Sequence, residues 1–259
     1  MASAATIFGM ETKVEFLRLA RAKSFSLATI GFPVMFYLLF GIVNSHGLGG
    51  EQVARYLLAT YTVFGLVGCS LFGVSVTLAS ERTLGWLELK QASPMPAWTY
   101  LCAKLLTAMA FGLIIFAILL TLGKTMGGVV LTGTQVFHMA LAVMGGVVPF
   151  ASLGLLLAMI IPPNSATGVV NLIYLPMSFL SGLWMPLKNL PTGLQKLAPM
   201  WPTYHLARVE LFAAGSPLKN YDGLPGSDSI LMHWVWLAAF SVVTLVLAAV
   251  MFRRNAAKG

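Results

Sequence analysis

Long apolar runs without acidic or basic residues are the feature that most constrains this chain. A helix needs about 20 apolar residues to cross the hydrocarbon core of a bilayer, and these runs are of that order. Only 9% of the 259 residues are charged, whereas a soluble domain usually carries about 25%. The sequence therefore predicts an all-α polytopic membrane protein with a single transmembrane domain over residues 1–259.

Six runs are candidate membrane spans. Their approximate ranges are 27–45, 56–79, 98–123, 136–161, 165–187 and 230–252. The fifth run is interrupted by Pro176, Gly182 and Pro186. Helices broken in this way are tolerated where protein or a cavity surrounds them. We therefore expect either a re-entrant outer hairpin near the fifth span or a kinked span.

The distribution of Lys and Arg predicts the orientation of the chain. With the N-terminus inside, ten basic residues lie on the inner side and six on the outer side. Cytoplasmic flanks of membrane spans collect Lys and Arg. This predicts a multi-pass protein of the cell membrane with both termini cytoplasmic. The same bias explains the net charge of +8, so we do not expect nucleic-acid binding.

Two segments outside the spans have patterns of their own. Residues 8–23 are typical of an amphipathic helix at the lipid interface, with apolar residues such as Phe16 and Leu19 in lipid and basic residues toward the head groups. Residues 188–229 are semi-polar and are expected to form an outer segment. Within them, Pro202 to Ala214 predicts a short helix that stops at Gly215.

Motifs for catalysis, cofactors and metals are absent from the sequence. Gly123-Lys124-Thr125 lacks the first glycine of a nucleotide-binding P-loop, because that position holds Ile118. The four histidines form no close metal-ligand pattern, and the two cysteines are interpreted as small buried hydrophobic residues. We expect no catalytic, cofactor-binding or metal-binding residue on this chain, which therefore does not hydrolyse ATP by itself.

Ionisable residues deep in the spans would mark an ion or proton pathway. Only Lys104 interrupts a span with a full charge, and it lies near the inner end of the third, where it is expected to snorkel toward water. The predicted spans therefore offer almost no ionisable group that could bind a coupling proton or sodium ion. The energy for transport would come from elsewhere, or the protein is passive.

The charged stretch between the second and third spans is the main candidate functional segment. Glu81, Arg82, Glu88 and Lys90 fall within ten positions, between two apolar runs. The spacing is helical and would let Glu81, Arg82 and Glu88 point to the cytosol. Ser93-Pro94-Met95-Pro96 ends this helix, because proline cannot continue one. A short charged helix joined to two spans suits a docking element for a soluble partner, although a generic cytosolic loop is the alternative.

Two stretches resemble the permeases of type-2 ABC transporters. ERTLGWLELKQASPMPAWTYLCAK at 81–104 is similar to the family's loop between the second and third spans. FLSGLWMPLKNLPTGLQKLAPMWPTYHLARV at 179–209 is similar to its fifth-span region. The resemblance extends over essentially the whole chain. The residues that match the family's loop pattern are Glu81, Arg82, Gly85, Leu87, Glu88, Ser93 and Pro94.

The resemblance implies a transporter subunit without its own ATPase site. Such a permease pairs with a second permease, often a homodimer partner, and with separate ABC ATPase subunits that carry ATP and Mg. Glu81, Arg82, Gly85, Leu87 and Glu88 would then belong to a cytosolic coupling helix that sits in a groove of the ATPase, alongside the N-terminal interfacial helix. The outer segments at 180–215 would form a re-entrant hairpin that caps the exit path.

The substrate is not identified by any motif. A cavity lined by apolar and aromatic residues without buried charge would favour a hydrophobic or amphipathic molecule, such as a drug, an antibiotic or a lipid. The alternative function is a polytopic membrane protein without an ATPase partner, either an intramembrane enzyme or an assembly factor.

Overall fold

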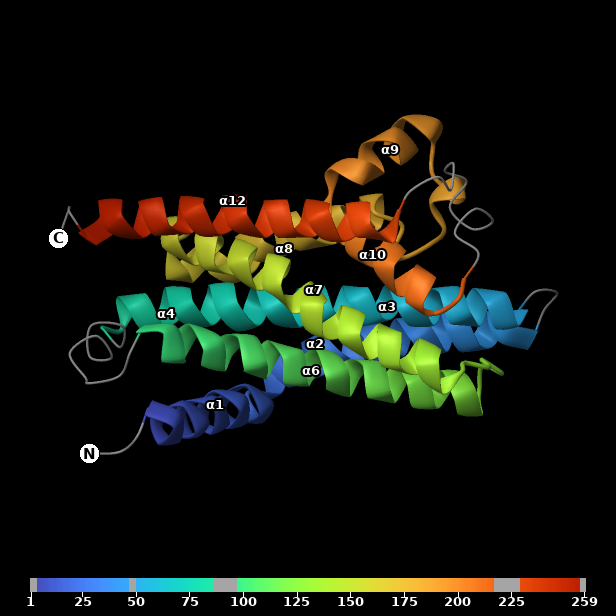
Figure 1. The fold of residues 1–259 in the computed structure, drawn as a ribbon, viewed down its shortest axis with the longest axis horizontal. Helices are drawn as coiled ribbons and strands as arrows, with labels where there is room; N and C mark the ends of the chain where they lie inside the picture. The colour runs from blue at the N-terminus through green and yellow to red at the C-terminus, as the bar shows by residue number, and fades with distance from the viewer. Residues whose placement is uncertain (1–3, 47–49, 86–96, 217–228, 257–259) are drawn as a thin grey trace.

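Long helices that run side by side make up most of the molecule (Figure 1). The computed structural model describes residues 4–46, 50–85, 97–216 and 229–256, and the regular secondary structure in these ranges is helical. Five helical segments are long and apolar enough to cross a membrane. They are Lys23–Ser45, Gly50–Thr83, Thr99–Thr125, Gly133–Ile160 and Ile230–Arg254. For the described residues, the prediction of an all-helical protein with several membrane spans is confirmed.

The second of these segments lies at the centre of the bundle. It consists of α3 (Gly50–Leu71), a π-helical turn η3 (Phe72–Val76) and α4 (Thr77–Thr83). In its most apolar stretch 83% of the residues are buried, against 22% for the peripheral helix α12 (Ile230–Ala256). Thr60, Thr62 and similar small side chains let the neighbouring helices enclose α3 on all sides.

The first segment packs beside α3 and changes its winding along its length. α2 (Lys23–Phe36) continues into a π-helical turn η1 (Tyr37–Ile42) and a 3₁₀ turn η2 (Val43–His46). Pro33 within α2 removes one backbone donor, and helix geometry that departs from the regular α-form relieves such sites. The lipid-exposed side chains Leu27, Phe32 and Leu39 lie on the outer face of this segment.

The third and fourth segments are α6 (Ala97–Thr125) and α7 (Gly133–Ile160). A capping box begins α7: the Gln135 amide donates to the Thr132 hydroxyl at 3.3 Å, and the Thr132 amide donates to Gln135 Oε1 at 2.8 Å. At the other end, α7 ends at Ile160 with Ile161 as its C-cap, and Pro163 opens α8 (Pro163–Leu180) as its first residue. The chain therefore turns between the two helices at Ile161 and Pro162.

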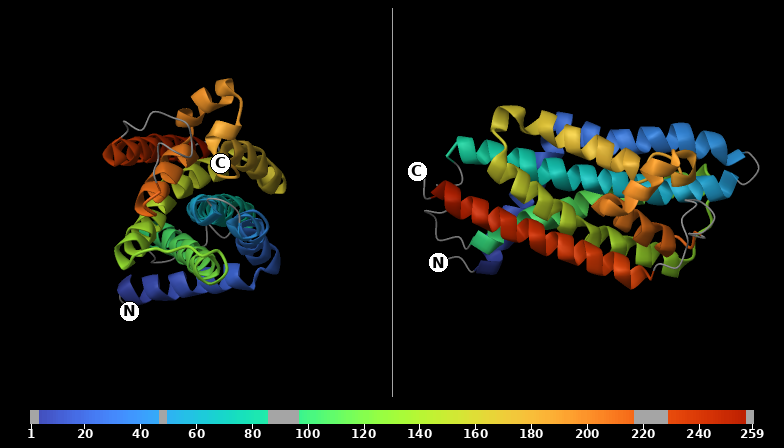
Figure 2. Two further views of the ribbon diagram at one scale, coloured as in Figure 1. Left: turned by 90° about the vertical axis from the view of Figure 1, so that its right-hand side faces the viewer. Right: turned by 90° about the horizontal axis from the view of Figure 1, so that it is seen from above.

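The fifth predicted span, 165–187, differs from the structure. α8 ends at Leu180, and residues 181–187 form a turn that leads into a 3₁₀ turn η4 (Leu187–Asn189). α8 lies along the bundle (Figure 2) but is not among the five segments that are apolar enough to span a membrane, because its first turns are polar. The six-span layout stays a prediction.

The segment that follows folds back onto the bundle. It contains α9 (Thr192–Leu197), η5 (Ala198–Met200) and α10 (Pro202–Ala213). The predicted short helix is confirmed with its stop, since Gly215 adopts a φ of 68°. α10 is not an outer surface helix, because it is almost completely buried against α3, α7 and α12. A re-entrant membrane hairpin stays a prediction.

The predicted N-terminal amphipathic helix is α1 (Ala4–Arg21), and it runs across the end of the bundle rather than along it (Figure 2). Leu19 does not lie in lipid as expected, because it is 5% exposed and packs with Cys69 and Phe111. The ends of α4 and α12 and the turn between α7 and α8 lie at the same end of the molecule (Figure 1). We call this the α1 end of the bundle.

Candidate functional site

Three of the five predicted coupling residues lie in the described part of the chain, all at the end of α4. Glu81 and Arg82 are in its last turn, and Gly85 follows it. Leu87 and Glu88 lie outside the described residues. The described part of the candidate site is therefore the base of the predicted docking segment, which lies at the α1 end of the bundle.

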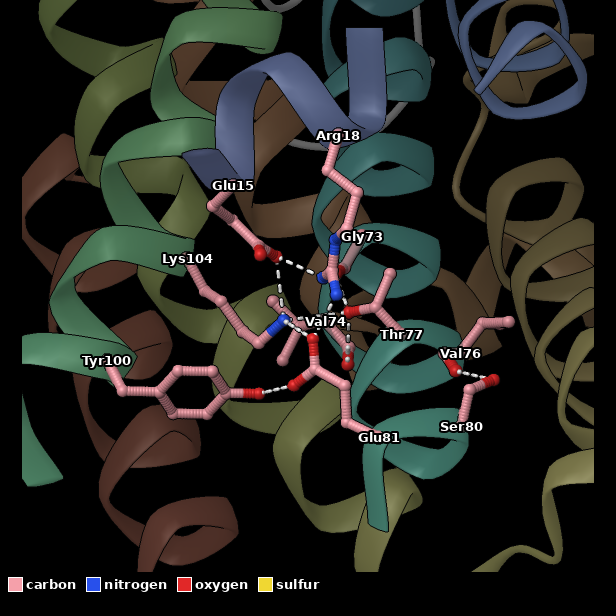
Figure 3. Close-up of polar contacts among 10 residues, drawn as sticks. All are labelled: Glu15, Arg18, Gly73, Val74, Val76, Thr77, Ser80, Glu81, Tyr100 and Lys104. Atoms are coloured by element: carbon pink, nitrogen blue, oxygen red, sulfur yellow. Dashed lines mark hydrogen bonds and ion pairs between the residues drawn. The ribbon is translucent and has the colours of Figure 1, made fainter. Parts of the chain in front are cut away.

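Glu81 points into the bundle and not toward the cytosol, so the expected orientation of this side chain is wrong. Its side chain is only 7% exposed. One carboxylate oxygen accepts a hydrogen bond from the Arg18 guanidinium, and the other accepts one from the Tyr100 hydroxyl (Figure 3). The spacing along α4 could not reveal this orientation, because both partners come from helices distant in sequence.

Lys104 of α6 is equally buried, with 2% of its side chain exposed, so the expected snorkelling toward water is wrong as well. Its Nζ lies 2.7 Å from Glu15 Oε1 and 3.5 Å from Glu81 Oε1. It also donates to the Thr77 hydroxyl at 2.9 Å. These partners replace the water that a charged amine would otherwise require.

Arg18 completes a group of four charged side chains that we call the ion cluster: Glu15, Arg18, Glu81 and Lys104. Arg18 Nη2 lies 2.8 Å from Glu15 Oε1 on the same helix. Burial disfavours the charge of Arg18, but Glu15 and Glu81 outweigh this effect and raise the pKa of its guanidinium. Two carboxylates face two cations, so the ion cluster is neutral as a whole.

The ion cluster connects three helices that are far apart in sequence. Glu15 and Arg18 come from α1, Glu81 from α4 and Lys104 from α6 (Figure 3). α4 precedes the predicted docking segment and α6 follows it. The ion cluster therefore connects α1 to both of the helices that flank that segment.

Arg82 also contacts other parts of the bundle, but its partners lie at the end of α7. Its guanidinium donates to the carbonyl of Met159 at 2.9 Å and to that of Ile161 at 3.3 Å. These carbonyls belong to the last turn of α7 and the residue after it, where acceptors lack partners within the helix. Arg82 thus fixes the end of α4 to the turn between α7 and α8.

Gly85 allows the chain to leave α4. Its φ is 71°, a left-handed conformation that glycine adopts without steric cost. Leu84, directly before it, is 69% exposed. The surface of the predicted segment therefore begins with an exposed apolar side chain, after the buried Glu81 and half-buried Arg82.

Sequence reasoning missed Glu15 and Tyr100 and misjudged Lys104. The available signal was Lys104 itself, the one full charge inside a predicted span, because such charges usually pair with another group. The pairing of α1 with the bundle could not be predicted, since Glu15 and Lys104 are 89 positions apart.

A second feature is a cavity of about 830 Å³ between α2, α3 with η3, and α8. Aromatic side chains line much of it, with Phe64 stacked on Tyr174 at 4.9 Å between ring centroids and Phe36 beside Trp184 at 5.2 Å. None of the described residues that line it is charged. Its size suits a drug-sized molecule or a lipid chain.

Polar groups gather in the half of the cavity nearer the α1 end. Thr29 of α2 and Thr77 of α4 line it, and Thr167 and Asn171 lie one turn apart on α8. The Asn171 side chain makes no hydrogen bond with the described part of the chain. The cavity is therefore amphipathic, with neutral polar groups together with Phe25 toward the α1 end and rings such as Phe36 and Trp184 farther from it.

Histidines at the opposite end of the bundle form a buried pair. Nδ1 of His205 lies 2.8 Å from Nδ1 of His233, and His205 Nε2 donates to the Pro199 carbonyl at 2.9 Å. Within the described ranges, no group of three or more His, Cys, Asp or Glu residues is placed to hold a metal ion. Cys69 is buried and Cys102 half-buried, and both are unpaired.

Comparisons with known proteins agree with this architecture. The chain is 26% identical over 206 residues to a protein of Bacillus subtilis (strain 168) named "Putative transport permease YvfS", an alignment that covers 78% of this chain and 84% of the relative. The ABC-2 type transporter family matches residues 8–212, from α1 through α10, and so includes both the ion cluster and the cavity. Because this match spans well over half of the sequence, the chain belongs to the ABC-2 type transporter family and is a multi-pass membrane transport permease.

Proposed function

We propose that this chain is the transmembrane permease subunit of an ATP-driven exporter, and that a separate ABC ATPase subunit supplies the energy. Family membership supports a transporter, and the sequence lacks a P-loop of its own. ATP and Mg then bind to the partner chain, and this chain contributes the path through the membrane. The assembled complex, and not this subunit alone, hydrolyses ATP.

In this proposal the whole chain is one membrane domain with six spans. α8 crosses the membrane in addition to the five apolar segments. Both termini lie in the cytoplasm, so the α1 end of the bundle is the cytoplasmic end. Two observations support this orientation: the excess of Lys and Arg at that end, and the lateral position of α1, which suits a helix at the lipid interface. The segment containing α9 and α10 then caps the outer end as a hairpin.

The docking surface for the ATPase comprises the segment after α4, including Gly85, Leu87 and Glu88. Leu84 supports this assignment, because an exposed apolar side chain at the cytoplasmic end is suited to burial in a groove of a soluble partner. Glu81 and Arg82 contribute from inside, by holding the base of the segment to α1, α6 and α7.

The substrate class rests on the lining of the cavity, in which none of the described residues is charged. A hydrophobic or amphipathic molecule loses no hydration of charged groups on entering it, whereas a polyanion would enter without a counter-charge. Asn171 supports an amphipathic substrate, since its amide can bond a neutral polar group while rings such as Phe36 and Trp184 contact the apolar part. The second permease of the complex is another copy of this chain, which completes the cavity from its open side.

A purification experiment tests the partner. The chain is isolated in mild detergent from its native membranes as wild type, as Leu84→Asp and as Leu231→Asp. Leu231 is a matched control, because it is 67% exposed and lies at the opposite end of the bundle. We expect a P-loop ATPase to accompany the wild type and the control but not Leu84→Asp. If no ATPase accompanies the wild type, the chain is a membrane protein of another class.

A binding experiment tests the substrate class. Native mass spectrometry of the purified chain in nanodiscs is carried out with a neutral alkyl glycoside and with a polyanionic polysaccharide. We expect the glycoside to bind, and Asn171→Leu to weaken this binding roughly tenfold, the loss of about one hydrogen bond. Asn164→Leu, an exposed position on the same helix outside the cavity, is the control. Preference for the polysaccharide contradicts the proposed substrate.

A further inference from the structure

The ion cluster divides into two neutral halves, one on each side of the contact between α1 and the bundle. On α1, Glu15 and Arg18 form a pair with 2.8 Å between Oε1 and Nη2. On the bundle, Glu81 and Lys104 face each other with 3.5 Å between Oε1 and Nζ. Each half carries one negative and one positive charge.

Two further pairs cross the contact and hold α1 in place. Lys104 Nζ lies 2.7 Å from Glu15 Oε1, which is shorter than its distance to Glu81 within the bundle. Arg18 donates to Glu81 across the same contact. In the arrangement seen, each of the four groups therefore has a partner on its own side and a partner on the other side (Figure 3).

This double pairing changes what it costs to separate α1 from the bundle. When one partner of a buried ion pair is removed, the other charge usually remains unpaired, and this is strongly unfavourable. Here the separation leaves Glu15 with Arg18 and Glu81 with Lys104, so no charge loses its last partner. The ion cluster thus permits two arrangements of α1, where a simple salt bridge would permit only one.

The joint between α1 and α2 is compatible with release. α1 and α2 are separate helices joined at Ala22, where the backbone leaves the helical conformation with a ψ of 87°. The apolar contact of α1 with the bundle includes Phe16, which lies 5.3 Å from Phe111 between ring centroids, and Leu19 packs beside them. The break in the helix at Ala22 allows α1 to move as a unit without unwinding α2.

We propose that Glu15, Arg18, Glu81 and Lys104 are positioning residues that exchange partners, so that α1 alternates between the docked arrangement seen here and a released one. Glu81 precedes the docking segment and Lys104 follows it, so the exchange shifts that segment together with α1. The inference rests on the proposed function in one respect: the ATPase is what biases the two arrangements, by a difference in its contacts with each.

Four double variants separate partner exchange from a purely structural role. Each removes one carboxylate and one cation and so leaves the net charge unchanged. Two of the variants each remove one whole half of the ion cluster: Glu15→Gln with Arg18→Met removes the half on α1, and Glu81→Gln with Lys104→Met removes the half on the bundle. The other two variants remove one group from each half: Glu15→Gln with Lys104→Met, and Arg18→Met with Glu81→Gln. Each leaves a single ion pair across the contact. When α1 separates from the bundle, neither of the two remaining charges keeps a partner.

The readout is the distance between spin labels at Met10→Cys on α1 and Phe252→Cys on α12, in a chain whose Cys102 is replaced by alanine. Both labelled positions are exposed, at 64% and 43%. The purified chain is measured in nanodiscs without an ATPase. We expect the released population to rise roughly tenfold in the two variants that lack one half, and to stay at or below the wild-type level in the two that keep a single crossing pair.

A released population above the wild-type level in the two variants that keep a single crossing pair would overturn the proposal, because a cluster that only fastens α1 loosens whenever a crossing pair is lost. Hydrogen–deuterium exchange of the wild type gives a second readout that needs no substitution. The amides of α1 are expected to exchange faster than those of α6, and equal protection contradicts release. These measurements do not involve the ATPase. The proposal of partner exchange can therefore fail while the copurification of the ATPase succeeds, and the copurification can fail while partner exchange is observed.

Discussion

Glu15 of α1 and Lys104 of α6, 89 positions apart in the sequence, form a buried ion pair with 2.7 Å between Oε1 and Nζ. The pair joins a helix that lies across the bundle to one that runs along it. Both side chains are almost fully withdrawn from solvent, so their charges depend on each other and on the neighbouring Glu81 and Arg18.

Lys104→Met is expected to destabilise the protein strongly. It leaves Glu15 and Glu81 buried with Arg18 as the remaining cation, and removal of one partner from a buried pair costs about 3 to 5 kcal/mol. For a chain of this size the melting temperature should fall by roughly 6 to 12 °C. Thermal unfolding in detergent measures this, with the double variant Glu15→Gln, Lys104→Met as comparison. The double variant should melt above the single one, and a lower melting temperature would count against the pairing.

Arg82→Met is expected to loosen the end of α7. The substitution removes the donors to the Met159 and Ile161 carbonyls, and a hydrogen bond from a charged group is worth about 1.5 to 3 kcal/mol. Hydrogen–deuterium exchange should therefore rise in the last turn of α7 and not in its first turn. Arg82→Lys should restore little of the protection, because a single ammonium cannot reach both carbonyls in the same geometry. Full protection in the lysine variant would show that charge alone suffices.

Gly146→Val tests the contact between α7 and α10. A Cβ at Gly146 would lie 2.7 Å from the buried Leu206 side chain, so that side chain or α10 must shift. Such overpacking costs about 1 to 3 kcal/mol, which thermal unfolding detects. Gly168→Val on α8 is the matched control, since nothing lies within 4 Å of its Cβ position. If both variants lose the same stability, helix propensity and not packing is the cause.

Glu210→Gln is expected to flatten the dependence of stability on pH. Glu210 of α10 is 1% exposed, its Oε2 has no hydrogen-bond partner in the described structure, and burial raises the pKa of its carboxyl well above the usual value. The folded state therefore holds this proton more tightly than the unfolded state. Stability is highest below the unfolded pKa and falls as the pH rises from there toward the folded pKa.

The glutamine variant cannot lose a proton, so it should gain stability over the wild type as the pH is raised from 5 to 8. Melting temperatures across this range, measured in one detergent, provide the check. Parallel curves for the two proteins would mean that Glu210 is not the group responsible.

The long helices and the short ones were predictable from the sequence to different degrees. Five spans could be located within a few residues because a helix in lipid must be apolar on all sides over a minimum length. α10 could be bounded because Pro202 and Gly215 mark its ends by backbone chemistry. The burial of α10 could not be predicted, since its charged side chains Arg208 and Glu210 are typical of a surface helix.

The candidate site shows the same division. The amphipathic pattern of α1, the charged stretch after the second span and the position of Lys104 in the third could all be read from the sequence, because they are properties of neighbouring residues. The meeting of Glu15, Arg18, Glu81 and Lys104, and the inward orientation of Glu81, became visible only in the packed structure. Charges in an apolar chain must find partners, but which partners they find depends on helix packing, and no local pattern encodes that.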